Sequence, residues 1–300
     1  MYLCSLKLRL IVIMRILVTG ANGQLGRELH NVLESEIPGK TVYTDIAELD
    51  LTDANAVNLF FQRNEISHVV NCAAYTAVDK AEEEKLECAA ININAVKNLA
   101  TAADTIGAKI IHISTDYVFD GTAHRPYKEA DKVNPISQYG TTKRKGETAL
   151  LALAPESIII RTSWLYSPYG NNFVKTMLRL GNEQPKIKVV CDQIGTPTYA
   201  QDLAQAIYKV LMSHQWVEGI FHYANEGVCS WYDFAKTIHR LAGITGCEIK
   251  AIPTEEYPTA ATRPFYSVFD KTRIKATYGA EVPYWEDSLK KCIERINNEK

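Results

Sequence analysis

Short apolar runs alternate with amphipathic segments through the first half of this 300-residue chain. Five runs rich in β-branched residues have the length of strands and cover 15–20, 41–44, 68–74, 109–115 and 157–163. Between them, apolar residues that recur every three or four positions predict helices over 26–36, 54–64, 91–107 and 140–154. This alternation predicts βαβ units and a Rossmann-type, doubly wound parallel sheet of the α/β class. The central strands are almost entirely apolar, which is typical of strands buried on both faces.

The regular alternation ends in the second half, which is richer in proline, tyrosine and tryptophan and contains a predicted helix over 231–243. We interpret this half as a smaller α/β substrate-binding domain that is interleaved with the Rossmann domain. The expected Rossmann domain covers 14–163 and part of 192–222. The expected substrate domain covers 164–191 and 223–300.

The first thirteen residues are basic and apolar. They are too short to span a membrane and lack a small-residue cleavage site. Because the first predicted strand follows Met14 directly, we expect residues 1–13 to be an N-terminal extension and Met14 to be the natural start. A targeting segment is the alternative.

Composition narrows the class of protein. With 46% hydrophobic and 23% charged residues, the chain falls among globular proteins rather than disordered or fibrous ones. A net charge of −2 gives no electrostatic reason to expect nucleic acid or a membrane as partner. The seven cysteines are scattered without a CxxC pair, so we expect reduced thiols in the cytoplasm. The seven histidines form no close pair, and we expect no dedicated structural metal site.

A glycine-rich segment separates the first predicted strand from the first helix. Gly20, Gly23 and Gly26 form a G-x-x-G-x-x-G pattern. Glycines there allow a tight turn and close approach to a pyrophosphate, which the helix N-terminus attracts. The pattern alone is weak, but its place between strand and helix favours a dinucleotide site over a bare turn. Asp45 follows the second strand, where an acidic side chain usually binds ribose hydroxyls, although a surface turn is an equal alternative.

Tyr139 and Lys143 form a Y-x-x-x-K pattern at the start of a predicted helix, which places both on one helix face. A free tyrosine has a pKa of about 10, so proton transfer near pH 7 needs roughly 4 kcal/mol of stabilisation of the phenolate. A nearby ammonium and a nicotinamide cation both act in that direction. The pattern is common by chance, but Ser114 and Thr115 end the strand 109–115 at the edge where ligands of such sheets bind.

The glycine loop, the strand-end hydroxyls and Y-x-x-x-K, in this order, resemble the extended short-chain dehydrogenase/reductase family over nearly the whole chain from Met14. Within it, six segments are similar to dTDP-4-dehydrorhamnose reductases, namely 71–82, 114–121, 139–147, 161–166, 171–178 and 192–198. The resemblance implies reduction of dTDP-4-dehydro-6-deoxy-L-mannose to dTDP-L-rhamnose by NADH or NADPH. That reaction is the last step of dTDP-rhamnose synthesis for cell-surface polysaccharides.

The resemblance also implies residue roles. Cofactor contacts are expected at the pyrophosphate, the adenosine and the nicotinamide half, from Gly20, Gly23, Gln24, Leu25, Gly26, Asp45, Asp50, Leu51, Ala73, Ala74, Tyr75, Thr76 and Lys143. Thr115 would hydrogen-bond the reacting sugar oxygen, Tyr139 would protonate it, and Lys143 would bind the nicotinamide ribose. Substrate contacts are expected from Thr115, Asp116, Tyr139, Trp164, Asn172 and the 192–198 loop, with Trp164 on the sugar ring and Asn172 toward the nucleotide end.

Two other activities of this superfamily fit the residues less well. A dehydratase would carry glutamate where Tyr117 stands, and a reductase-epimerase of the fucose type would carry a cysteine near 114–116. A non-catalytic regulatory subunit would be expected to lose Tyr139 or Lys143, and both are present.

Three properties stay open. No arginine lies between Lys40 and Asp53 to receive a 2′-phosphate, so we expect NADH to serve at least as well as NADPH. Some such reductases use magnesium at a subunit interface. Glu28 could take part, but Gln201 stands where a second acid would be needed, so no ligand is assigned. The protein could be a monomer or a homodimer.

Overall fold

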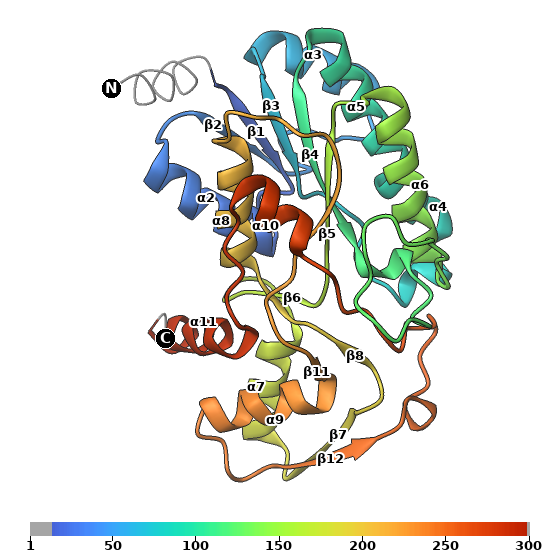
Figure 1. Ribbon diagram of the computed structural model, residues 1–300, viewed down its shortest axis with the longest axis vertical. Coiled ribbons are helices and arrows are strands. Elements are labelled where there is room, and N and C mark those ends of the chain that lie inside the picture. Colours follow the sequence, from blue (N-terminus) through green and yellow to red (C-terminus); the bar gives the residue numbers. More distant parts are fainter. Residues whose placement is uncertain (1–13, 299–300) are drawn as a thin grey trace.

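A computed structural model describes residues 14–298, and the expected extension at 1–13 lies outside them. The described chain forms a central six-stranded sheet in the order β10-β5-β4-β3-β1-β2. All neighbouring strands in it are parallel, which confirms the predicted doubly wound α/β fold (Figure 1).

The strands of this sheet are β1 (Ile16–Thr19), β2 (Thr41–Thr44), β3 (His68–Asn71), β4 (Lys109–Thr115), β5 (Ile158–Thr162) and β10 (Gly219–His222). Separate two-stranded sheets are formed by β6 (Leu165–Tyr166), β7 (Lys186–Val190), β8 (Ile194–Gly195), β9 (Thr198–Tyr199), β11 (Cys229–Ser230) and β12 (Glu248–Ile252). The α-helices are α2 (Gln24–Glu36), α3 (Ala54–Asn64), α4 (Lys85–Ala89), α5 (Ala95–Ile106), α6 (Gln138–Leu153), α7 (Phe173–Glu183), α8 (Ala200–Leu211), α9 (Trp231–Leu241), α10 (Thr272–Tyr278) and α11 (Trp285–Asn298). Short 3-10 turns are η1 (Lys80–Glu82), η3 (Asp116–Val118) and η4 (Thr254–Glu256), and η2 (Ala90–Asn94) is a π-helical turn that leads into α5.

Helices cover both faces of the sheet, as the apolar strands require. Along β1, Ile16 and Val18 pack into a core shared with α2 and α8, whereas Leu17 packs into a second core shared with α3, α5 and α6. Successive side chains of a strand point to opposite faces, so a four-residue buried strand serves two cores. The five predicted strands are confirmed with small changes at their ends, and β10 was not predicted from its pattern.

A smaller group of elements lies beyond the carboxyl ends of the strands (Figure 1). It contains α7, α9 and α11 with the parallel pair β7–β12, around a third apolar core. The chain returns from it to the sheet through α8 and β10. Ile274 and Tyr278 of α10 lie in a segment expected for the substrate domain. They pack instead into the core that the sheet shares with α2 and α8. The domain boundaries stay a prediction.

No helix within residues 14–298 is long and apolar enough to cross a bilayer. The described cysteines at positions 72, 88, 191, 229 and 247 are free thiols.

Candidate active site

A cavity of about 770 Å³ opens at the carboxyl ends of β1 to β5. The residues expected to contact cofactor or substrate line it, apart from Tyr75 and the 192–198 loop. The Tyr75 side chain is buried, and its hydroxyl donates a hydrogen bond to Glu84. None of residues 192–198 lines the cavity, although that loop was expected to reach the nucleotide end. The ligand contacts themselves stay predictions.

The glycine turn between β1 and α2 is packed so tightly that side chains are excluded. Gly20 has φ +64°, and a Cβ there would lie 2.7 Å from the backbone nitrogen of Ala73. A Cβ on Gly26 would lie 2.5 Å from the carbonyl oxygen of Gly20. No side chain of the described residues caps α2 at Gly23, so its first N–H groups stay available to an anion. The turn therefore fits a pyrophosphate.

The end of the cavity next to β2, where adenosine is expected, carries carboxylates held by hydrogen bonds. The Asp45 carboxylate accepts hydrogen bonds from the backbone nitrogens of Asn22 (3.0 Å) and Ile46 (2.9 Å), which fix it beside the glycine turn. Asp50 accepts from the amide and the hydroxyl of Thr52, and these bonds lower the pKa of its carboxyl.

The catalytic end is assembled where α6 meets η3. Ser137 caps α6 by accepting a hydrogen bond from the backbone nitrogen of Gly140 (3.1 Å). A Cβ on Gly140 would collide with the carbonyl of Tyr117, so only glycine lets the two elements approach this closely. The approach brings Tyr139, and Lys143 one turn later, into the cavity that Thr115 lines at the end of β4.

Burial governs the charges at this end. It raises the pKa of Tyr139 above its usual range, and a hydrogen bond with Thr115 only partly offsets this. The Y-x-x-x-K pattern predicted that the ammonium would favour the phenolate, but the loss of solvation dominates, and the phenol stays protonated. Burial also lowers the pKa of Lys143 to about 8, with Glu147 acting in the opposite direction. A protonated phenol is the form that can give a proton to a substrate oxygen.

Asp116 adds a second acid next to Tyr139. Burial raises the pKa of its carboxyl to about 6, and hydrogen bonds with the Ser267 and Thr115 hydroxyls offset this in part. Its Oδ1 accepts a hydrogen bond from the Thr115 hydroxyl (3.1 Å). Within residues 14–298, its buried Oδ2 has no hydrogen-bond donor.

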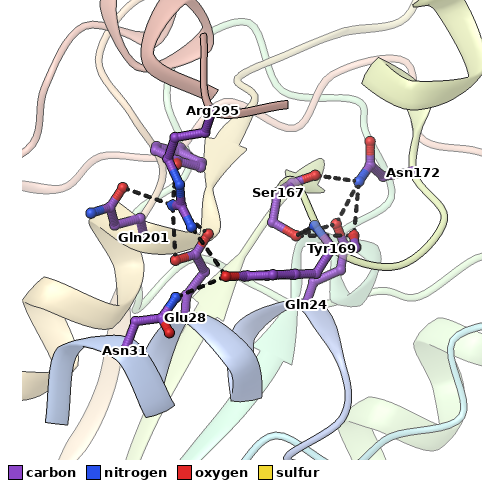
Figure 2. A network of polar contacts seen from close by, with 9 residues as sticks. Gln24, Glu28, Asn31, Ser167, Tyr169, Asn172, Gln201 and Arg295 are labelled. Atoms are coloured by element: carbon purple, nitrogen blue, oxygen red, sulfur yellow. Dashed lines mark hydrogen bonds and ion pairs between the residues drawn. The ribbon is translucent and has the colours of Figure 1, made fainter. Parts of the chain in front are cut away.

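The side chains of Trp164 and Asn172, expected to bind the sugar nucleotide, are both fixed by contacts with other residues of the protein. Trp164 has φ 48°, an uncommon backbone conformation for a large residue, and its indole stacks on Trp231 with ring centroids 3.6 Å apart. Asn172 caps α7, accepting from the backbone nitrogen of Lys175. Its amide nitrogen lies 2.9 Å from the side-chain oxygen of Gln24 (Figure 2). This bond joins the α7 loop to the glycine turn.

Comparison with known proteins places this site in a family. The model of the RmlD substrate binding domain family matches residues 14–298. A dTDP-4-dehydrorhamnose reductase of Aggregatibacter actinomycetemcomitans is 41% identical over 285 residues, which is 92% of this chain and 97% of the relative. The chain belongs to the dTDP-4-dehydrorhamnose reductase family.

Two solved members of this family share the whole fold. A Clostridium acetobutylicum dTDP-4-dehydrorhamnose reductase is 48% identical with a TM-score of 0.91, covering 95% of this chain and 100% of that one. A Bacillus anthracis dTDP-4-dehydrorhamnose reductase, solved in complex with NADP, is 41% identical with a TM-score of 0.89 and covers 96% and 99%. A Thermus thermophilus UDP-glucose 4-epimerase at 19% identity and TM-score 0.82 shows the fold alone.

Glu28 was considered above as a participant in magnesium binding, and Gln201 stands where a second acid would be needed. Both side chains contact an arginine instead. Arg295 of α11 approaches Glu28 at 2.9 Å and Gln201 at 3.1 Å, and it also bonds the Tyr199 and Tyr169 hydroxyls (Figure 2). Its guanidinium supplies the positive charge that the buried Glu28 requires. Among residues 14–298, no group of three or more acidic, histidine or cysteine side chains could hold a metal ion. Magnesium at this position is not supported.

Two basic residues near the site were not predicted from the sequence. Arg295 lies 267 positions from Glu28, and no local pattern links them. Arg27 follows the last glycine of the turn, is exposed, and donates to the carbonyl of Asn22 (3.2 Å), whose amide bonds Asp45. The prediction on cofactor choice rested on the segment after the second strand, which contains no arginine. Arg27 lies instead in the first turn of α2, directly after the glycine pattern.

Proposed function

We propose that the protein reduces the 4-keto group of dTDP-4-dehydro-6-deoxy-L-mannose to give dTDP-L-rhamnose, using NADH or NADPH. One observation carries the proposal: buried Thr115, Tyr139 and Lys143 share a single cavity with a glycine turn that fits a dinucleotide. The relatives named dTDP-4-dehydrorhamnose reductase support the choice of substrate.

Each residue of the catalytic end has a distinct task. A bound nicotinamide cofactor supplies the hydride that reaches C4 of the sugar. Tyr139, protonated because it is buried, transfers its hydroxyl proton to the carbonyl oxygen as negative charge develops there. Thr115 donates a hydrogen bond to the same oxygen, and Lys143 holds the cofactor ribose. Asp116 and Trp164 contact the sugar, and Asn172 orders the loop beside the nucleotide.

The elimination chemistry of a dehydratase is disfavoured by Tyr117. Its ring packs edge-on against Tyr139 with centroids 5.4 Å apart. Burial raises the pKa of its phenol above the usual range, so Tyr117 stays protonated and cannot act as the second base that elimination needs. A non-catalytic role would not explain why Tyr139 and Lys143 are both buried in the cavity with shifted pKa values.

The test is a cofactor-oxidation assay with purified protein. The enzyme should oxidise NADH or NADPH with dTDP-4-dehydro-6-deoxy-L-mannose at a kcat/KM well above that with other nucleotide-linked 4-ketosugars. NMR of the product should identify the L-rhamno configuration at C4. A higher kcat/KM with a differently configured ketosugar, or release of an epimerised ketosugar without cofactor oxidation, would overturn the assignment. Sedimentation of the same preparation would decide between monomer and homodimer.

A further inference from the structure

A buried row of polar side chains leads from β1 across the sheet to Lys143. The Thr19 hydroxyl donates to Oδ1 of Asn71 at 2.7 Å, and Nδ2 of Asn71 lies 2.9 Å from Nδ1 of His112. Nε2 of His112 lies 3.5 Å from Nζ of Lys143. All four side chains are at most 2% exposed. Neither the sequence patterns nor the proposed chemistry gives His112 or Asn71 a role.

A backbone group fixes the orientation of Asn71. The N–H of Ala73 donates to Oδ1 of Asn71 at 3.1 Å. A backbone N–H can only donate, so the oxygen of the amide must face it. If the amide were turned over, its NH₂ group would meet the N–H of Ala73, donor against donor. The nitrogen of Asn71 therefore faces His112 and donates to it.

The orientation of Asn71 in turn fixes the proton of His112. Nδ1 of the imidazole must accept the hydrogen bond from Asn71, so it carries no proton. Burial, with the nearby Lys143, holds the pKa of His112 well below its usual range, so the ring is neutral. A neutral imidazole with an unprotonated Nδ1 carries its proton on Nε2. That N–H faces Lys143.

An N–H facing Lys143 discriminates between the two charge states of the amine. An ammonium has three donors and no lone pair, whereas a neutral amine can accept the bond from Nε2–H. The hydrogen bond from Nζ to the carbonyl of Ile113 (2.7 Å) is available in both states. The other ionisable groups that face Lys143 are Cys72 after β3, Cys88 on α4 and Glu147 on α6. Burial keeps both thiols neutral, and Glu147 is already paired with Arg161.

We propose that His112 is a positioning residue that donates Nε2–H to Lys143 and favours its neutral amine. In the reaction, which rests on the proposed function, Tyr139 loses its hydroxyl proton to the substrate. Tyr139 and Lys143 line the same cavity, and the phenol is restored by a net proton transfer in which a Lys143 N–H bond breaks and a Tyr139 O–H bond forms. His112 stabilises the neutral amine left behind, until solvent returns the proton. Asn71 and the Ala73 N–H act through His112.

The first test reads the tautomer directly and requires no activity. Long-range ¹H–¹⁵N spectra of protein labelled at histidine distinguish protonated from bare ring nitrogens. His112 should show a bare Nδ1 and a protonated Nε2 from pH 6 to pH 9. His222 is the internal control, because its Nδ1 lies 3.1 Å from the carbonyl of Tyr127 and must carry the proton. A protonated Nδ1 on His112, or a charged ring in this range, would overturn the proposal.

The second test reverses the tautomer. In Asn71→Asp, the carboxylate still accepts from Ala73 but now requires a proton on Nδ1 of His112, so Nε2 becomes an acceptor for the ammonium. The titration midpoint of Lys143, followed by NMR of labelled lysine, should rise by about one pH unit or more. Thr19→Val is the matched control: it removes a hydrogen bond from Asn71 but leaves the Ala73 N–H, so the midpoint should stay. An unchanged midpoint in Asn71→Asp would contradict the proposal.

His112→Phe covers the case in which Asn71→Asp does not fold. It keeps a ring at this position but removes the Nε2–H donor, so the neutral amine loses its hydrogen bond and the midpoint should also rise. A midpoint that does not rise in His112→Phe would contradict the proposal. In folded variants the alkaline limb of the kcat profile should move upward with the midpoint. The proposed function and the proposal on His112 can be overturned independently of each other. Absence of reductase activity would overturn the proposed function and leave the tautomer result standing, whereas the other tautomer would leave the reductase standing.

Discussion

The two ends of the cavity are formed by different kinds of chemical group. At the cofactor end, backbone amides, glycines and accessible carboxylates form the surface, and Asp45 and Asp50 are held by backbone groups at the edge of solvent. At the catalytic end, Thr115, Tyr139 and Lys143 are at most 8% exposed. Binding a large, charged dinucleotide needs many donors at little desolvation cost. Moving a proton needs few groups, whose charge states burial can set.

The largest expected effect tests the catalytic end. Tyr139→Phe removes the proton donor and should lower kcat by ~10²–10⁴, the usual contribution of general acid catalysis. Cofactor affinity, measured by fluorescence titration, should change little, because the hydroxyl belongs to the other end. Tyr166→Phe is a matched control, since Tyr166 is a buried phenol whose hydroxyl has no partner within residues 14–298. A Tyr139→Phe enzyme with near wild-type kcat would refute the assignment.

The next prediction concerns what holds the cofactor end in place. Arg295→Met removes the guanidinium beside the fully buried Glu28 and should cost about 3 kcal/mol in the free energy of unfolding. Because Glu28 lies on α2 behind the glycine turn, KM for the cofactor should rise while kcat stays within a few-fold. Arg240→Met breaks an exposed pair with Glu286 and should cost under about 1 kcal/mol. Equal costs for the two variants would show that burial of Glu28 does not set the loss.

A pH-dependent prediction probes the catalytic end again. The folded-state pKa of Asp116 is about 6, above the ordinary value of 3.8. Its contribution to stability is therefore present below pH 3.8 and is lost as the pH rises through 6. Asp116→Asn should be more stable than the parent at pH 8, by about 1–3 kcal/mol, and the gap should close as the pH falls toward 4. Denaturant unfolding at both pH values measures it, and a gap independent of pH would mean that the carboxyl is not desolvated.

The same contrast explains what the sequence could predict. The five sheet strands and the glycine turn could be predicted because each depends on residues within its own segment. Apolar runs mark the strands, and Gly20 marks the tight turn between the first strand and the first helix. Tyr139 and Lys143 were found because one helix carries both. Arg295 reaches Glu28 from the other end of the chain, and His112 acquires its role only from Asn71 on the neighbouring strand. The charge state of Tyr139 was also missed, since the extent of burial depends on packing that no local pattern contains.

The smallest expected effect concerns which cofactor the open end prefers. With the adenosine ribose at Asp45, as proposed, the carboxylate would accept hydrogen bonds from the ribose hydroxyls but repel a 2′-phosphate, by up to about 4 kcal/mol per charge pair at ~4 Å and less after screening. This repulsion favours NADH, in line with the prediction from the sequence. Arg27 is exposed and donates to the carbonyl of Asn22, whose amide binds Asp45, so it supplies the opposite charge near that carboxylate. The Bacillus anthracis relative was solved in complex with NADP, which carries a 2′-phosphate.

We therefore expect NADH to be at least as good as NADPH, with a ratio of kcat/KM values below about tenfold, because Asp45 and Arg27 act against each other. Arg27→Ala should move the ratio several-fold further toward NADH, and Asp45→Ala should move it toward NADPH. Neither change should alter kcat at saturating cofactor, because neither charge reaches the catalytic end. A wild-type preference for NADPH above tenfold would show that the Arg27 charge outweighs Asp45 at the ribose. A ratio insensitive to both substitutions would place the ribose elsewhere along the cavity.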